Sequence, residues 1–182
     1  MGYKYENAID EHGVATHEFT IWNNLRQRVG KGSYTDVSIS EDFLDFELWL
    51  KWSKEQIGFM SRDNSNNLFH IDKDILSRGR GLEYSKDMCI FVPHCLNTLC
   101  KRHKGVLPRG VYFDRRKKKK PYRVKGTFNS IPFSGGYHSS IESASAKYRE
   151  IREQHINTLK DIYEKDVDPR VWDAIIDDIW YT

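Results

Sequence analysis

Apolar residues in the first sixty positions recur at steps of three and four, the spacing that places side chains on one face of a helix. The stretch 17–29 carries such a face, formed by Phe19, Trp22, Leu25 and Val29. The stretch 40–59 begins with Ser40, a residue type that caps helices, and carries a second face, formed by Phe43, Phe46, Leu50 and Ile57. The pattern predicts two amphipathic helices whose tryptophans pack in a core.

Between residues 61 and 104 the pattern changes to short apolar runs separated by turn-rich loops. The runs 68–76 and 88–93 are predicted strands, and Pro93 ends the second of them. Residues 94–103 then have the composition of a short helix. The predicted order is strand, loop, strand and helix, which is a ββα unit.

Three strand-like runs follow, over 105–114, 118–128 and 130–139. Ser139 and Glu142 have capping-box spacing and precede a long run of helical periodicity that reaches Ile162. Asp168 and Pro169 predict the start of a terminal helix. The expected fold is therefore α+β: an N-terminal helical region with a ββα unit (1–104), then a three-stranded antiparallel sheet packed on one long helix (105–165), and a C-terminal helix (166–182).

Composition limits the class of protein further. Apolar residues make up 38% of the chain and charged residues 30%, which predicts a folded protein with little disorder. The sequence contains no run of about 18 apolar residues and no signal-peptide core, so we expect a cytoplasmic protein without a membrane partner. Cys89, Cys95 and Cys100 lie in apolar surroundings and are expected to be reduced thiols.

Positive charge is concentrated in one segment, although the net charge is only +3. Residues 101–126 contain twelve lysines and arginines and a single acid, Asp114. Because every second side chain of a strand shares a face, one face of this sheet can pack on the helix while the other presents cations. The predicted DNA-binding residues are Arg109, Tyr112, Arg115, Arg116, Lys117, Lys118, Lys119, Lys120, Tyr122, Arg123 and Lys125.

Double-stranded DNA is the expected partner of this basic segment. Lysine and arginine contact phosphates, arginine also reads guanine edges, and a two-stranded ribbon fits the major groove. Tyr112 and Tyr122 lie among the cations and could stack on unpaired bases, so RNA binding stays open as an alternative. The terminal acids Asp173, Asp177 and Asp178 are not expected to contact DNA.

The basic segment LPRGVYFDRRKKKKPYRVKGTF, the strand after it and the helix ESASAKYREIREQHI resemble the Apetala/ethylene-response-factor type of DNA-binding domain. That family presents an arginine-rich three-stranded sheet to the major groove and braces it with a helix. Upstream lie IWNNLRQRV, YTDVSIS, EDFLDFELWLKW, IDKDIL (71–76), YSKDMCIFVP (84–93) and Asn97. This order resembles phage HNH-type (His-metal-finger) homing-endonuclease-like proteins that carry such a domain at the C-terminus. The resemblance covers residues 17–165 and implies action in a bacterial host cytoplasm.

The resemblance implies a site for one Mg or Mn ion, with Asp72 and Asn97 as ligands. Asp74 would be a second metal carboxylate, or a salt-bridge partner of Lys73 or Arg78. Such nucleases use the metal to stabilise charge on the phosphate. No structural zinc is expected, because the chain has no pair of CxxC motifs.

The general base of this family is a histidine beside the first aspartate, but this chain has Lys73 there. A protonated lysine cannot accept a proton from water. His70, two residues before Asp72 on the same strand face, and His94 are the candidate substitutes. Two functions therefore stay open: a metal-dependent endonuclease that nicks or cuts duplex DNA, which the resemblance favours, and a catalytically inactive DNA-binding regulator or inhibitor, which Lys73 favours.

Overall fold

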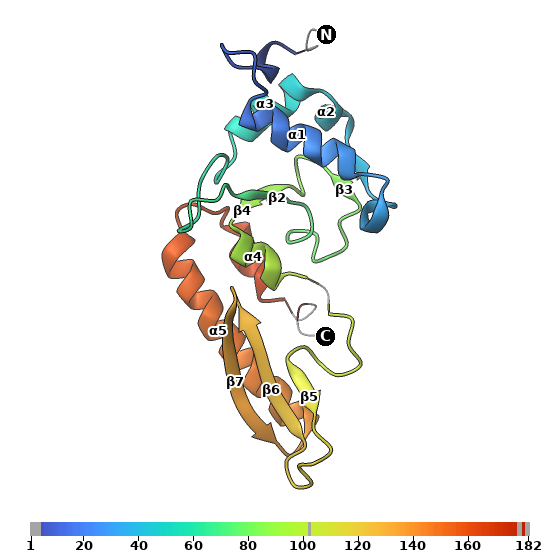
Figure 1. Cartoon of the computed structure of the whole chain (residues 1–182), viewed down its shortest axis with the longest axis vertical. Coiled ribbons are helices and arrows are strands. Elements are labelled where there is room, and N and C mark those ends of the chain that lie inside the picture. Colours follow the sequence, from blue (N-terminus) through green and yellow to red (C-terminus); the bar gives the residue numbers. More distant parts are fainter. Residues whose placement is uncertain (1–4, 102, 178–179, 181–182) are drawn as a thin grey trace.

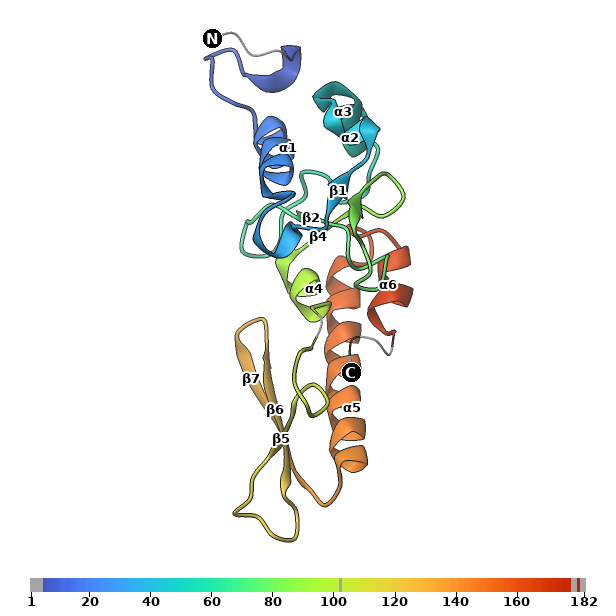
Figure 2. The ribbon, with the colours of Figure 1, turned by 90° about the vertical axis from the view of Figure 1, so that its right-hand side faces the viewer.

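Helix α5 (Ile141–Tyr163) joins the two ends of an elongated molecule (Figures 1 and 2). The structure is a computed structural model that describes residues 5–101, 103–177 and 180. Helices lie at one end, a three-stranded antiparallel sheet lies at the other, and the fold is mixed α+β. This confirms the predicted fold class and the predicted pairing of the sheet with one long helix. No helix in the described part of the chain has the length and apolar content needed to cross a membrane.

The N-terminal end is helical, as predicted, but the second predicted helix is divided. The elements are 3-10 turns at Glu6–Ala8 and Gly32–Tyr34, α1 (His17–Arg28), α2 (Glu41–Leu44) and α3 (Phe46–Lys54). Asp45 interrupts the helix because its extended backbone lets its carboxylate accept the N–H groups of Glu47 and Leu48, at 2.9 and 3.1 Å. The side chain of Ser40 makes no capping hydrogen bond, and Ile57 lies beyond α3 and is exposed.

The middle of the chain forms an antiparallel strand pair followed by a helix. Strand β2 (His70–Asp72) pairs with β4 (Ile90–Val92), and α4 (His94–Leu99) follows β4 directly. Strand β2 is shorter than predicted because the Asp72 carboxylate turns the chain by accepting the N–H groups of Asp74 and Ile75. A short parallel pair, β1 (Ser38–Ile39) with β3 (Glu83–Tyr84), was not predicted.

The sheet at the other end has the strand order β5-β6-β7. Its strands are β5 (Val111–Phe113), β6 (Tyr122–Phe128) and β7 (Ile131–His138). Asn129 and Ser130 join β6 to β7 with φ values of 47° and 66°, the left-handed backbone that tight hairpins need. Gly135 is an extra residue in β7, and a Cβ there would lie 2.7 Å from Val124 and 3.0 Å from Ile151. This bulge lets β7 approach α5 closely.

Two hydrophobic clusters share α5. Near its N-terminus, Ala144 and Tyr148 pack on Val111 and Val124 of the sheet. Farther along, Ile156, Leu159 and Tyr163 belong to the larger cluster, which also contains residues of α1, α3, β2, β4, α4 and α6 (Arg170–Ile175). The helix is capped by Ser140, which accepts the N–H of Ser143, and not by the predicted Ser139.

A buried arginine ties three helices together at the end of the larger cluster. Arg152 of α5 is completely buried, and its guanidinium donates to the carbonyl oxygens of Ile175 at 2.9 Å and of Leu99 at 3.3 Å. Leu99 is the last residue of α4, so the guanidinium lies at the negative end of that helix.

The terminal helix begins close to its predicted start, where the Asp168 carboxylate accepts the N–H of Arg170. Of the three terminal acids, Asp173 is exposed and Asp177 binds Arg78, whereas Asp178 lies outside the described residues. All three cysteines are free and buried, as the sequence predicted.

Candidate nucleic-acid interface

A row of three side chains crosses the sheet on the face opposite α5. Tyr112 of β5 is paired with Arg123 of β6, and Arg123 is paired with Tyr137 of β7. The next residues along β5 and β6, Val111 and Val124, are buried against α5, so the row lies on the other side. Together with Lys125 and Thr127, these three residues define what we call the outer face.

Aromatic rings hold the cations of the outer face in place. The Lys125 Nζ lies 4.8 Å from the centre of the Tyr112 ring. The Arg123 guanidinium carbon and the Lys117 Nζ lie 5.7 and 5.5 Å from the centre of the Tyr137 ring. Cations over aromatic faces gain roughly 0.5–1 kcal/mol each at exposed positions. The outer face therefore presents ordered positive charge and ring surface together.

The turn between β5 and β6 extends this charge beyond the edge of the sheet. Its residues from Arg115 to Lys120 are all exposed. Asp114, the single acid of the segment, pairs with Arg116 through two hydrogen bonds of 2.9 and 3.0 Å. That pairing lowers the pKa of the Asp114 carboxyl, so the acid stays ionised and neutralises Arg116. The four lysines Lys117 to Lys120 carry the remaining charge of the turn together with Arg115.

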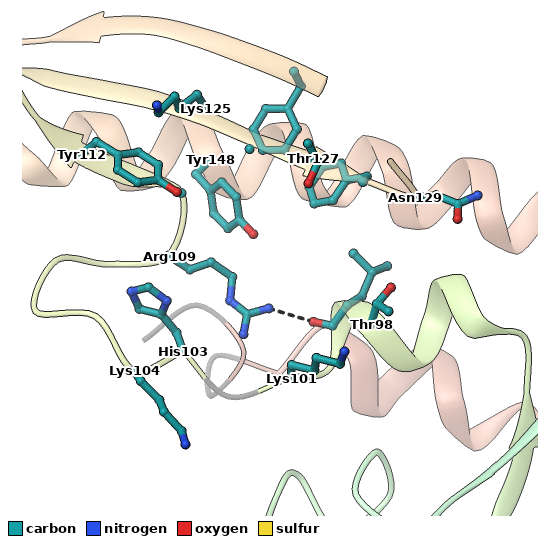
Figure 3. A pocket seen from close by; sticks show the side chains of 15 residues that line it. Thr98, Lys101, His103, Lys104, Arg109, Tyr112, Lys125, Thr127, Asn129 and Tyr148 are labelled. Carbon is teal, nitrogen blue, oxygen red and sulfur yellow. Dashed lines mark hydrogen bonds between the residues drawn. The ribbon is translucent and has the colours of Figure 1, made fainter. Parts of the chain in front are cut away.

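Two of the predicted DNA-binding residues lie elsewhere. The Arg109 guanidinium points away from the outer face and donates to the Leu99 carbonyl oxygen at 3.0 Å (Figure 3). Burial lowers the pKa of Arg109, and its guanidinium adds to the cap on the C-terminus of α4. Tyr122 packs against Phe113, with ring centres 5.6 Å apart, and is half-buried beside the small cluster.

The residues predicted for nuclease chemistry form two separate groups. Asp72 is buried, and one of its carboxylate oxygens accepts two backbone N–H groups, at 2.9 and 2.7 Å. Burial raises the pKa of Asp72 from 3.8 to about 6. Lys73 is also buried and donates to the Asp74 carboxylate at 2.7 Å and to the Gly81 carbonyl oxygen at 2.8 Å. Of the two roles considered for Asp74, the geometry gives the ion pair with Lys73.

His70 and Asn97 form the second group, because both line one cavity of about 510 Å³. Asp72 is not among the described residues that line this cavity. Arg28 and Arg62 line it as well, so a positive charge faces the histidine. The His70 and His94 rings are 5.3 Å apart, and burial, His94 and Arg28 lower the pKa of His70. His70 is therefore neutral at neutral pH and can accept a proton.

These residues do not fit a divalent ion in this arrangement. The Asp74 carboxylate is paired with the Lys73 ammonium, and the Asp72 carboxylate accepts backbone N–H groups of the turn after β2. Across the residues that the structure describes, no group of three or more histidine, cysteine, aspartate or glutamate side chains could hold a metal ion.

Sequence reasoning missed Tyr137 and the arginines of the His70 cavity. The third strand was predicted, but the register that brings Tyr137 beside Arg123 depends on the bulge at Gly135. The Gly-Gly pair in that strand is the signal that could have indicated a bulge. Arg28 and Arg62 come from segments distant in sequence, and no pattern joins them to His70.

No protein-family model, curated protein or solved structure matches this chain.

Proposed function

We propose that this protein binds duplex DNA through the outer face of its sheet and the adjacent basic turn. The observation that carries the proposal is the row of Tyr112, Arg123 and Tyr137, flanked by Lys125 and Lys117, on a sheet face that no other element of the described chain covers (Figure 2). Cations held over rings on a twisted sheet can follow the phosphates on both sides of a major groove. The resemblance to the Apetala/ethylene-response-factor domain supports the same proposal.

One face of the sheet packs on α5 and stabilises the fold, and the opposite face is available for binding. Val111 and Val124 face α5 and stabilise the sheet, whereas Arg123 and Lys125 are not part of either hydrophobic cluster. Each phosphate contact releases counterions, so affinity should fall steeply as salt is raised. Tyr112 and Tyr137 order the cations before binding, which lowers the entropy lost on association.

The test measures binding of a labelled duplex by fluorescence anisotropy at low and moderate salt. The double variant Arg123→Ala/Lys125→Ala should bind about tenfold or more weakly than the parent protein. The matched control, Lys51→Ala/Lys54→Ala on α3, removes the same charge at the opposite end of the molecule and should bind within about twofold of the parent. Equal losses in both variants, or no binding by the parent protein at low salt, would refute the proposal.

Phosphodiester cleavage is the second candidate function. It is favoured by the cavity in which a neutral His70 and Asn97 face Arg28 and Arg62, since a base beside cations suits attack on a phosphate. Lys73 counts against it, because its ammonium is held by Asp74 and Gly81 and does not take the place of a base. Without cleavage, the same scaffold would act as a DNA-binding regulator or inhibitor.

Supercoiled plasmid distinguishes the two candidates. The parent protein is incubated with the plasmid and Mg or Mn, beside the variants His70→Ala and Asn97→Ala. Nicking that both substitutions abolish, while duplex binding is retained, would support the nuclease. Plasmid that stays supercoiled over many hours, at protein concentrations that saturate binding, would leave the non-catalytic role.

A further inference from the structure

A cavity of about 380 Å³ lies where the sheet meets the end of α4 and the loop after it (Figure 3). One wall is formed by α5 and the sheet, from which Tyr148, Tyr112 and Thr127 project. The facing wall carries Thr98 and Lys101. The volume lies in the range of sites for small molecules and is large enough for a single nucleotide.

The lining combines positive charge with rings and hydrogen-bonding groups. Lys101 and Lys125 contribute ammonium groups, whereas the Lys104 side chain points away from the cavity (Figure 3). None of the described residues that line the cavity is an aspartate or a glutamate. Tyr112 and Tyr148 bring rings to the lining, together with Phe133 and Phe128; Phe128 already stacks on Phe133 and on His155, with ring centres 4.5 and 4.6 Å apart. An inorganic anion needs only the cations, whereas a nucleotide uses cations and ring surface together.

Strand β6 presents a free edge to this cavity. Within the part of the chain that the structure describes, strand β5 pairs with Tyr122–Val124 of β6, and the rest of β6 extends past the end of β5. The N–H of Lys125 donates to the Gly110 carbonyl oxygen on the β5 side, at 3.0 Å. Peptide groups of a strand alternate in direction, so the N–H and C=O of Thr127 face the same side, past the end of β5. A donor and an acceptor from one residue, with the Asn129 amide nearby, suit the polar edge of a base.

The cavity is also continuous with the outer face. Tyr112, Lys125 and Thr127 line both this cavity and the shallow hollow on the outer face. A strand bound on the outer face can therefore reach the cavity without leaving the protein surface.

We propose that this cavity binds one unstacked nucleotide, with its base among the rings and its phosphate near Lys101. The inference rests on the proposed function, because the nucleotide would belong to the nucleic acid held on the outer face. It predicts that the protein prefers a duplex with one unpaired nucleotide over a fully paired duplex, since an unpaired base is already free to leave the stack.

The experiment compares anisotropy titrations of two labelled duplexes that differ only by a one-nucleotide bulge. The parent protein should bind the bulged duplex about tenfold more tightly, the size of one base–aromatic stacking contact. The pocket variant Lys101→Ala/Asn129→Gly should reduce that preference, because it removes the cation proposed to contact the phosphate and the amide near the base edge. Both residues are exposed, and glycine accepts the φ of 47° at position 129, so the variant should fold. The control, Lys118→Ala, removes the same charge from the turn, and should weaken both complexes equally and keep the ratio.

The outcomes separate this inference from the proposed function. Tight binding of both duplexes with equal affinity would overturn the nucleotide site and leave the duplex-binding proposal intact, as would a pocket variant that keeps the full preference. Failure of the parent protein to bind either duplex would refute the proposed function itself. A mononucleotide titrated against the parent and the pocket variant identifies the source of the ligand: saturable binding that the pocket substitutions abolish would support the site and assign it to a free nucleotide.

Discussion

Replacing Asp72 with asparagine should stabilise this protein at neutral pH. The side chain is buried, and burial raises its pKa from 3.8 to about 6. Ionisation of Asp72 at pH 7 therefore opposes folding, and the two pKa values correspond to about 3 kcal/mol of lost stability. The asparagine oxygen can still accept the N–H groups of Asp74 and Ile75, so the turn after β2 is retained.

The raised pKa of Asp72 determines that the stability of the parent protein falls, and does not rise, with pH. Well below pH 3.8 the carboxyl is protonated in both folded and unfolded states and contributes nothing to the pH dependence. As pH rises towards 6, the unfolded state loses its proton first, so the stability of the parent protein falls across this window. Asparagine does not titrate, and the advantage of Asp72→Asn should therefore grow from pH 4 to pH 7.

Urea denaturation monitored by tryptophan fluorescence, with EDTA present, measures the difference at both ends of this window. We expect Asp72→Asn to gain about 2–3 kcal/mol at neutral pH relative to its difference at acid pH. The matched control is Asp74→Asn, which removes the carboxylate that holds the buried Lys73 ammonium and should destabilise the protein by about 3 kcal/mol. A loss of stability in Asp72→Asn at neutral pH, or a difference that does not change with pH, would contradict the reasoning.

Three further results are expected. Alanine at Lys117–Lys120 should reduce the slope of log affinity against log salt by up to about 3.6 if each lysine contacts a phosphate, as measured by anisotropy, and an unchanged slope would exclude such contacts. Arg152→Ala should lower the free energy of unfolding by about 3–5 kcal/mol, because the buried carbonyl groups of Leu99 and Ile175 lose their donor. A loss below about 1 kcal/mol would argue against a stabilising role for these two hydrogen bonds. Gly135→Ala should lower the free energy of unfolding, measured by chemical denaturation, by about 1–3 kcal/mol, because the added methyl group collides with Val124 and Ile151. An unchanged stability would mean that the backbone at the bulge shifts to make room.

The sheet and its helix could be predicted because their information is local. Alternation in 111–113 and 122–128, turn residues between the strands and the long helical period after Ser140 each act within a few residues. The same reasoning failed at 40–59, where Asp45 competes for the backbone N–H groups and divides one predicted helix into two.

The candidate site was less predictable because it depends on contacts between distant segments. The positive charge of the sheet was evident from composition, but Arg109 turned out to cap α4, ten residues earlier in the chain. Lys73 could be placed beside Asp72 from the sequence, whereas its binding to Gly81 requires the loop to fold back on β2. The identity of the family and the cleavage activity stay predictions, whereas the residues predicted to hold a metal do not fit a divalent ion in this arrangement.

Because α5 serves two hydrophobic clusters, the sheet is not an autonomous module. A fragment that ended after Tyr148 would lose Ile151, which packs on the sheet cluster, and one that carried the whole helix would expose Ile156 and Leu159 to water. Recombination that moved the basic sheet with α5 into another protein would leave the apolar residues of α5 that pack in the larger cluster without their partners. Limited proteolysis should accordingly release no stable fragment, and the two ends of the molecule should melt in a single transition.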